Sequence, residues 1–270
     1  MASPASRPIG VFDSGIGGLT VVKELFRVLP QESVLYFGDT ARVPYGNKSR
    51  ETIVKFSTES VLFLLHHEVK LVIVACNTAS SHALPFLERS FSVPLIGVIE
   101  PGVQAAISAT RTKRIGVIGT SATVASGAYE RAIHRLDPTI TVTSARCPLF
   151  VPVVEEGWVQ RPVARAIARE YLAPLVKAKV DTLILGCTHY PLLKEMLREV
   201  LGSKIQLIDS AYQVAQHAKV ILQHRHALQA HANGHRPIHH FYVSDESKHF
   251  TELGRRFLGR PIGPVTRVTV

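Results

Sequence analysis

The sequence is poor in cysteine and has no long apolar run. Its three cysteines, Cys76, Cys147 and Cys187, include no C-x-x-C pair and no zinc-ligand spacing, so they indicate neither a disulfide framework nor a structural zinc site. No apolar stretch reaches the roughly 18–20 residues of a membrane helix. Residues 1–7 lack the apolar segment of a signal peptide. We therefore expect a soluble, cytoplasmic protein with no metal centre and no membrane partner.

Charge of one sign does not gather at any point along the chain. The 31 Lys and Arg residues outnumber the 21 Asp and Glu residues, which gives a net charge of +10, yet no basic run exceeds two residues. No nucleic-acid-binding motif accompanies the excess. We interpret it as a solvated surface that favours anionic ligands in general. We do not expect a nucleic-acid partner.

Apolar residues are plentiful, and they are distributed in short runs. They make up 46% of the 270 residues, and the length suits two domains of about 100–150 residues each. The short runs alternate with amphipathic stretches, which is typical of parallel strands joined by helices. The predicted strands are Ile9–Phe12, Leu71–Ala75, Leu95–Val98, Ile115–Ile118, Leu183–Leu185 and Ile205–Ile208.

Apolar spacing and capping residues predict helices between these runs. The residues of Leu19–Leu29 place one apolar face toward a core, and a second helix follows the N-cap residue Ser49. A third helix begins at Pro162, which suits a first helical position. Its inward-facing residues are predicted to be Val163, Ile167, Leu172 and Leu175.

Two segments recur along the chain in the same order. Ile9–Ser14 resembles Ile115–Thr120, and Leu71–Thr78 resembles Thr182–His189 at a nearly equal offset. Such a repeat indicates two similar domains. The predicted fold class is therefore α/β, with two similar parallel-sheet α/β domains facing each other across a cleft. Because no Gly- or Ser-rich linker separates them, we expect the chain to cross between the domains more than once.

The segment 224–240 differs from the rest of the chain in composition. It holds six histidines among its seventeen residues. His-rich tracts can bind metal, but we interpret this one as a polar loop that follows a helix. No role is assigned to it.

Small polar residues follow several of the predicted strands, which is where ligands bind in open parallel sheets. Asp13–Gly18 contains three glycines ahead of a helix, so its backbone can approach an anion closely. This loop matches neither a Walker phosphate loop nor the dinucleotide-binding fingerprint. Pro44–Gly46 offers a phenol and an unencumbered backbone N–H group in a second turn.

Cys76 and Cys187 each follow a predicted buried strand, at the same place in the repeated unit. Cys147 lacks that context, and we interpret it as an inert buried thiol. A nucleophilic cysteine enzyme needs one Cys and a His base, and a disulfide oxidoreductase usually has its cysteines close in sequence. Two thiols on opposite sides of one ligand suit proton transfer, because one removes a hydrogen and the other delivers one to the opposite face.

Four motifs in a fixed order carry a resemblance to a known family. They are VFDSGIGGL at Val11–Leu19, VPYG at Val43–Gly46, ACNTA at Ala75–Ala79 and GCTHYP at Gly186–Pro191. These segments resemble those of the glutamate racemases, in the cofactor-independent aspartate/glutamate racemase family. The resemblance implies two α/β domains with the active site between them and a reaction that uses no cofactor.

The resemblance also implies roles for individual residues. Cys76 is then the base for the D-enantiomer and Cys187 the base for the L-enantiomer, with Asp13, Glu155 and His189 assisting the thiols. The substrate-binding residues that it implies are Asp13, Ser14, Tyr45, Gly46, Asn77, Thr78, Thr188 and His189. No metal belongs to this set.

Domain organisation and biological role are implied in the same way. Residues 1–98 and 209–270 form a discontinuous domain that carries Cys76, and residues 99–208 form a second domain that carries Cys187. The reaction interconverts L- and D-glutamate by two-base proton transfer. It supplies D-glutamate for peptidoglycan synthesis, and thus for cell-wall biogenesis and cell shape. Members of the family are usually homodimers.

Two alternatives stay open. An isomerase acting on aspartate or a hydantoin differs only in the pocket for the substrate carboxylate. A two-domain solute-binding protein with a hinge agrees less well with paired cysteines and no signal peptide. In either isomerase, no Lys in the four motifs can hold pyridoxal phosphate. Backbone N–H groups and Ser, Thr and Asn side chains then have to stabilise the developing enolate.

Overall fold

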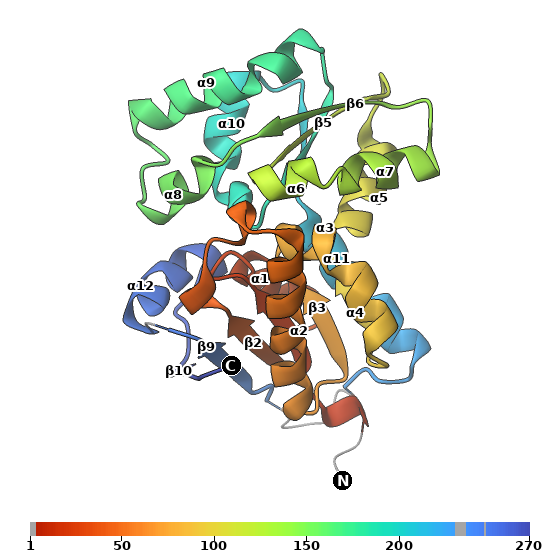
Figure 1. Ribbon diagram of the computed structural model, residues 1–270, viewed down its shortest axis with the longest axis vertical. Helices are drawn as coiled ribbons and strands as arrows, with labels where there is room; N and C mark the ends of the chain where they lie inside the picture. Colours follow the sequence, from red (N-terminus) through yellow and green to blue (C-terminus); the bar gives the residue numbers. More distant parts are fainter. Residues whose placement is uncertain (1–3, 230–235, 246) are drawn as a thin grey trace.

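The computed structural model describes residues 4–229, 236–245 and 247–270 (Figure 1). The strands are β1 Ile9–Asp13, β2 Val34–Gly38, β3 Leu71–Val74, β4 Leu95–Gly97, β5 Arg114–Gly119, β6 Thr141–Arg146, β7 Thr182–Gly186, β8 Gln206–Ile208, β9 His239–Val243 and β10 Val265–Arg267. The α-helices are α1 Leu19–Val28, α2 Arg50–His66, α3 Asn77–His82, α4 Leu84–Ser90, α5 Ile99–Ala109, α6 Ser121–Ala125, α7 Ala128–Leu136, α8 Phe150–Glu155, α9 Pro162–Lys177, α10 Lys194–Leu201, α11 Ser210–His224 and α12 Ser247–Leu258. Short 3-10 helices are η1 Pro4–Ser6, η2 Thr40–Arg42, η3 Tyr45–Asn47 and η4 Tyr190–Leu193.

The strands form two separate sheets. The first has the order β10-β9-β2-β1-β3-β4 and the second the order β6-β5-β7-β8. Their neighbouring strands pair in parallel. The order β2-β1-β3-β4 in the first sheet recurs as β6-β5-β7-β8 in the second, so the repeat in the sequence corresponds to a repeat of topology. The predicted fold class, two similar parallel-sheet α/β units, is confirmed.

Every predicted strand is present, with ends that differ by one residue at most. Four further strands, β2, β6, β9 and β10, lie outside the predicted set. Strand β2 is buried along its whole length and has the apolar run that marks a central strand. Strand β6 lies at a sheet edge and is largely exposed, so its sequence carries no such run. The exposed edge position explains why β6 carries no apolar run, whereas β2 is absent from the predicted set despite its apolar run.

The helix predictions are confirmed at the first two helices and wrong at one residue of the third. The predicted face of α1 is buried, and the Ser49 hydroxyl accepts a hydrogen bond from Thr52 N at 3.3 Å, as an N-cap does. In α9, however, Val163 is 43% exposed. The buried stripe of α9 consists of Ala164, Ala168, Leu172 and Leu175. Val163 lies one position off that stripe, and a 3.6-residue period turns it toward solvent.

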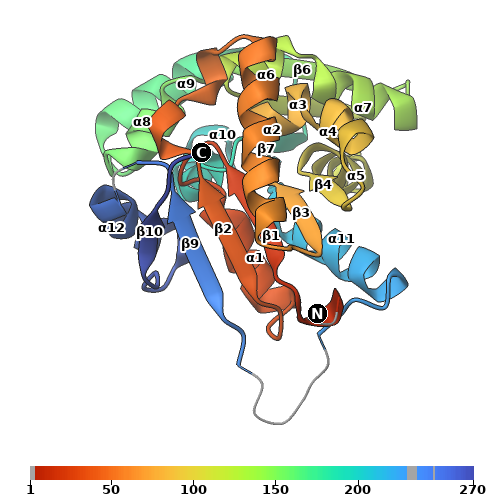
Figure 2. The same cartoon turned by 60° about the horizontal axis from the view of Figure 1, so that its bottom comes forward.

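The chain passes between the two sheets twice. It leaves the first sheet after β4 through α5 and returns after β8 through α11, so β9 lies beside β2 (Figures 1 and 2). The two crossings are neighbours, because a Cβ added at Gly102 of α5 would lie 3.2 Å from the Ser210 Cβ at the start of α11. Both passages between the sheets therefore run along one side of the molecule.

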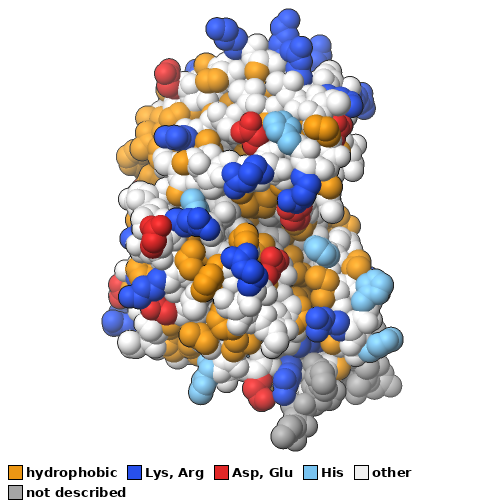
Figure 3. All heavy atoms as spheres, turned by 45° about the vertical axis from the view of Figure 1, so that its right-hand side comes forward, with side chains coloured by type: hydrophobic (Ala, Val, Ile, Leu, Met, Phe, Trp, Pro, Cys, Tyr) orange, Lys and Arg blue, Asp and Glu red, His pale blue; other side chains and the backbone are white. Residues whose placement is uncertain are grey.

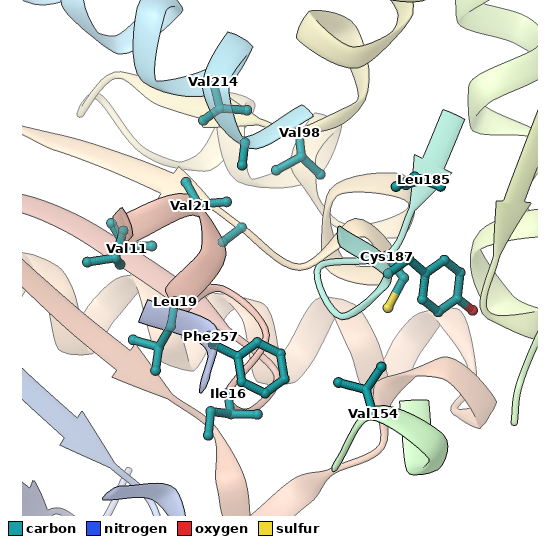
Figure 4. Close-up of a cluster of buried hydrophobic side chains, with 14 of the residues drawn as sticks. Val11, Ile16, Leu19, Val21, Val98, Val154, Leu185, Cys187, Val214 and Phe257 are labelled. Atoms are coloured by element: carbon teal, nitrogen blue, oxygen red, sulfur yellow. The ribbon is translucent and has the colours of Figure 1, made fainter. Parts of the chain in front are cut away.

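One hydrophobic cluster extends across both sheets. It includes Val11 and Leu19 from the first half of the fold and Leu185 and Cys187 from the second (Figure 4). Phe257, from the C-terminal helix α12, belongs to the same cluster, and its ring meets the His189 ring edge-on at 5.1 Å. The thiol of Cys187 thus lies where the core of one half joins that of the other.

Charged side chains are dispersed over the surface and do not form a patch of one sign among the described residues of the face shown in Figure 3. Lys and Arg side chains are spread over the face shown in Figure 3, with Asp and Glu side chains among them. Within the described ranges, no helix has the length and apolar character needed to cross a bilayer. Part of the His-rich segment 224–240, residues 230–235, lies outside the described residues, whereas His239 and His240 begin strand β9.

Candidate active site

A cavity of about 390 Å³ lies where loops from the carboxyl ends of both sheets meet. Cys76, after β3 of the first sheet, and Cys187, after β7 of the second, both line it. The lining residues are Ser14, Gly15, Val43, Pro44, Tyr45, Gly46, Asn47, Cys76, Asn77, Thr78, Thr120, Ser121, Pro148, Val151, Pro152, Glu155, Cys187, Thr188 and His189. The structure therefore brings the two thiols to one ligand-sized space.

Cys76 is a buried thiol at the start of helix α3. Its Sγ donates to the Ser14 hydroxyl at 3.4 Å and accepts from Ala79 N at 3.5 Å. Burial raises the pKa of Cys76 to about 12, and the carboxylate of Asp13 acts in the same direction. These effects outweigh the hydrogen bonds that the Ser14 hydroxyl and Ala79 N can donate to the thiolate, which lower the pKa. Cys76 consequently holds its proton at neutral pH.

Cys187 stands at the end of a chain of three groups. Its Sγ lies 3.9 Å from His189 Nδ1, and His189 Nε2 lies 2.9 Å from Glu155 Oε1. Burial lowers the pKa of His189, but its hydrogen bonds to Cys187 and Glu155 more than compensate and raise the pKa to about 10. The imidazole is thus a cation at neutral pH, and its proton can move to or from the sulfur.

Asp13 lies behind the cavity wall rather than in it. It is 1% exposed, accepts a hydrogen bond from Gly15 N at 2.9 Å, and is 3.5 Å from the Thr188 hydroxyl that donates to it. Burial raises its pKa, although the positive charge of His189 and backbone N–H groups oppose that effect. Asp13 therefore contacts the residues that line the cavity and is absent from the lining itself.

The two halves of the cavity touch at positions where only glycine fits. A Cβ at Gly17 would lie 2.1 Å from Thr188 Oγ1 and 2.5 Å from His189 Nδ1. A Cβ at Gly46 would lie 2.8 Å from the Thr120 Cβ. Both glycines come from the first half and all three partner residues come from the second, so the missing side chains let the halves close.

The remaining expected substrate-binding residues all line the cavity: Ser14, Tyr45, Gly46, Asn77, Thr78 and Thr188. Three of them are already hydrogen-bonded to the opposite half, Thr188 through the contact with Asp13 described above. The Asn77 amide donates to the Tyr129 hydroxyl at 2.7 Å, and the Thr78 hydroxyl lies 2.9 Å from that of Thr120. These hydroxyl and amide groups offer hydrogen bonds to a ligand from both sides.

Several lining residues lie outside the set expected from the sequence. Thr120 and Ser121 follow β5, and the sequence repeat gave a signal for them because it aligns Thr120 with Ser14. Pro148, Val151 and Pro152 form an apolar wall. No local pattern marks these last three, because their position depends on how α8 packs against η4 in the folded chain.

Cys147 is absent from the cavity lining and has no exposed surface. Burial raises its pKa to about 12. Its carbonyl oxygen accepts a hydrogen bond from the Tyr190 hydroxyl at 2.8 Å. Elsewhere in the described part of the chain, no three His, Cys, Asp or Glu side chains are grouped as a metal site requires.

Comparisons with known proteins agree on one family. Residues 9–218 match the family Asp/Glu/Hydantoin racemase. The chain is 50% identical over 264 residues to glutamate racemase of Geobacter metallireducens, covering 98% of this chain and 97% of that protein. The structure is similar to glutamate racemase isoform RacE1 of Bacillus anthracis, with a TM-score of 0.94, 42% identity and 98% of each chain covered. It is also similar to the Francisella tularensis glutamate racemase solved with D-glutamate, with a TM-score of 0.92, 41% identity and 98% of each chain covered.

The contact between Glu155 and His189 predicts a measurable pKa change. Glu155→Gln removes the carboxylate that helps to raise the pKa of His189, so we expect that pKa to fall from about 10 by about one unit or more. NMR titration of the imidazole signals measures it, with His189→Gln as the assignment reference. Glu156→Gln, at the exposed neighbouring position, should leave the value unchanged. An unaltered pKa in Glu155→Gln would contradict this account.

The same contact determines how stability depends on pH. The pKa of His189 lies above its ordinary value of 6.5 in the folded protein. Its protonation therefore stabilises the folded state fully below pH 6.5, and that contribution is lost as the pH rises toward 10. In Glu155→Gln the loss should be complete at a lower pH.

Proposed function

Because the chain belongs to the Asp/Glu/Hydantoin racemase family and is therefore an isomerase, we propose that it interconverts L- and D-glutamate without a cofactor. One observation carries the proposal: two cysteines at equivalent positions of two repeated sheets line the same cavity. A planar carbanion between them can be protonated from either side. The 50% identity to a glutamate racemase over nearly the full length supports glutamate as the substrate.

The domain division that we propose is residues 1–98 with 209–270, and residues 99–208. Strands β1–β4, β9 and β10 make up one sheet, and β5–β8 make up the other. Both boundaries fall just before a helix, α5 or α11. Cys76 then belongs to the discontinuous domain and Cys187 to the inserted one.

In the L-to-D direction, Cys187 removes the α-hydrogen of L-glutamate and Cys76 delivers a proton to the opposite face. The high pKa of Cys76, about 12, keeps on its sulfur the proton that this step requires. His189 stays protonated at neutral pH and lies next to the Cys187 sulfur. Cys76 thus lies near a carboxylate, which favours the thiol, and Cys187 lies near a cation, which favours the thiolate. The L-to-D reaction requires this difference.

In the D-to-L direction the roles exchange, starting from the state in which Cys76 has given its proton to the carbanion and Cys187 carries one. The Cys76 thiolate then removes the α-hydrogen of D-glutamate, and its hydrogen bond from Ala79 N helps to hold the thiolate. Cys187 protonates the other face, and the imidazolium of His189 can replace the proton it has given. Asp13 orients the Thr188 hydroxyl, which donates to it. Glu155 orients the His189 ring and favours its protonated form.

Neutral donors stabilise the developing negative charge in this mechanism. Ser14, Asn77, Thr78 and Thr188 supply hydroxyl and amide groups, and Gly46 supplies a backbone N–H group at the same wall. Loss of one such donor in an enzyme site typically costs about 100-fold in rate or more. A Schiff base with pyridoxal phosphate needs a lysine, and the described residues that line the cavity include none. The side chains present thus suit a reaction driven by fixed dipoles.

The biological part of the proposal follows from the family. We propose that the protein acts in the cytoplasm as a homodimer and supplies D-glutamate for peptidoglycan, and hence for cell-wall biogenesis and cell shape. The relatives at 50% and 42% identity that support it are glutamate racemases of bacteria.

Polarimetry tests the proposed substrate directly. We expect the purified protein to abolish the optical rotation of L-glutamate and of D-glutamate, and to leave L-aspartate and 5-substituted hydantoins unchanged. Conversion of aspartate or a hydantoin in place of glutamate would assign a different substrate. Binding of glutamate without loss of rotation would indicate a solute-binding protein.

Substitution of each cysteine tests the assignment of the bases. We expect Cys76→Ser and Cys187→Ser each to lower the racemisation rate by about a thousandfold or more, because a hydroxyl is a far weaker acid than a thiol. Cys147→Ser is the matched control, since Cys147 is buried away from the cavity, and it should change turnover by about threefold at most. An inactive Cys147→Ser variant together with an active Cys76→Ser variant would contradict the assignment of Cys76 as a base.

Isotope exchange tests the two-base mechanism. In deuterated water, a delivering thiol that has exchanged with solvent places deuterium on the α-carbon of newly formed D-glutamate. The L-glutamate recovered early in the reaction should stay largely unlabelled, which NMR of the α-proton measures at initial rates. A single base that serves both faces would instead label both enantiomers or carry the original hydrogen into the product.

A further inference from the structure

Asp39, which follows strand β2, is a buried carboxylate that is not part of the cavity. It has no exposed surface and does not line the cavity. It accepts hydrogen bonds from the Tyr45 hydroxyl, from Arg42 Nε at 2.7 Å and from the Ser244 hydroxyl at 2.9 Å. Three side-chain donors thus share the two oxygens of this buried carboxylate.

These donors come from separate parts of the fold. Tyr45 is in η3 and Ser244 follows β9 of the C-terminal segment. Arg42 also forms an ion pair with Glu59 of α2, and its guanidinium lies over the Phe56 ring at 4.2 Å. Asp39 therefore joins the turn at 40–47 to α2 and to the segment that returns from the second sheet.

The turn that Asp39 holds forms one wall of the cavity. Val43, Pro44, Tyr45, Gly46 and Asn47 all line it. Gly46 is the point at which this wall meets the other half, because a Cβ there would lie 2.8 Å from the Thr120 Cβ. The position of Tyr45 thus determines how closely this wall approaches Thr120.

We propose that Asp39 is a positioning residue for the substrate: through Tyr45 it holds the 43–47 wall against Thr120 and so sets the width of the cavity. A carboxylate is required there, because an amide offers one accepting oxygen and a nitrogen that faces other donors. The proposal rests on the proposed function, because its test measures KM and kcat for glutamate. Neither thiol nor the His189–Glu155 pair contacts Asp39, so its effect falls on substrate binding rather than on proton transfer.

Asp39→Asn tests this role by separating KM from kcat for glutamate. We expect KM to rise about tenfold, the loss that follows when a hydrogen bond to a charged group is removed, and kcat to stay within about threefold. Asp245→Asn is the matched control, since it makes the same change at an exposed neighbouring carboxylate paired with Arg267. It should leave both constants unaltered. A merely structural role predicts the opposite pattern, lower kcat from less folded enzyme at unchanged KM, and would overturn the proposal.

A double substitution shows whether Asp39 acts through Tyr45. Tyr45→Phe should raise KM by itself, and Asp39→Asn combined with Tyr45→Phe should be no worse than Asp39→Asn alone, because one contact is removed in both. If the KM increase of the double variant equals the product of the two single increases, the route through Tyr45 is refuted. If Asp39→Asn does not fold, Ser244→Ala removes one donor only and should raise KM about two- to threefold, whereas an unchanged KM would refute the proposal. Failure of the wild-type protein to racemise glutamate would refute the proposed function. That outcome is distinct from a failure of the Asp39 proposal, which is judged from the KM of the variants relative to the wild type.

Discussion

The contact between the glycine-rich loop after β1 and the loop after β7 is the constraint on which the site depends. Gly17 packs so closely on Thr188 and His189 that even a methyl group would overlap them. This approach buries Asp13 beneath Thr188 and keeps the His189 ring out of water. Without it, neither the shifted pKa of His189 nor the enclosed cavity would exist, because both require that solvent be excluded.

Burial has opposite outcomes on the two sides of the cavity. Cys76 is desolvated with a carboxylate nearby, so it is held neutral. His189 is equally desolvated but has Glu155 on one nitrogen and Cys187 on the other, so it is held charged. Two cysteines that occupy equivalent positions in a repeated topology thus acquire different surroundings. The difference comes from the loops that each sheet presents and not from the cysteines themselves.

The sequence predicted those features that depend on neighbours along the chain. Apolar runs located six of the ten described strands, β1, β3, β4, β5, β7 and β8. The repeat linked Cys76 to Cys187 before any contact was known. Val163 was misassigned because two adjacent residues can each continue an apolar stripe, and only packing decides between Val163 and Ala164. The stripe in α9 was therefore predicted to within one position.

Contacts between distant segments could not be predicted from the sequence, for a different reason. Asp39 is joined to Ser244 across most of the chain, and no local spacing records such a pairing. The roles of Glu155 and His189 came from family resemblance, since their residue types at those positions have no periodicity that indicates a proton relay. The identity of the substrate likewise depends on donors from several loops, which only the folded chain assembles.

The side-by-side passage of the chain between the sheets has a consequence for the origin of the protein. Segment 99–208 contains the whole second sheet, and its two ends lie together, with Gly102 of α5 against Ser210 of α11. Adjacent ends let a complete unit be spliced into a loop of a host without disturbing the host's core. The second sheet also repeats the strand order of the first. A gene segment that was copied and then inserted into its own parent would leave this arrangement, with one cavity-lining cysteine contributed by each copy.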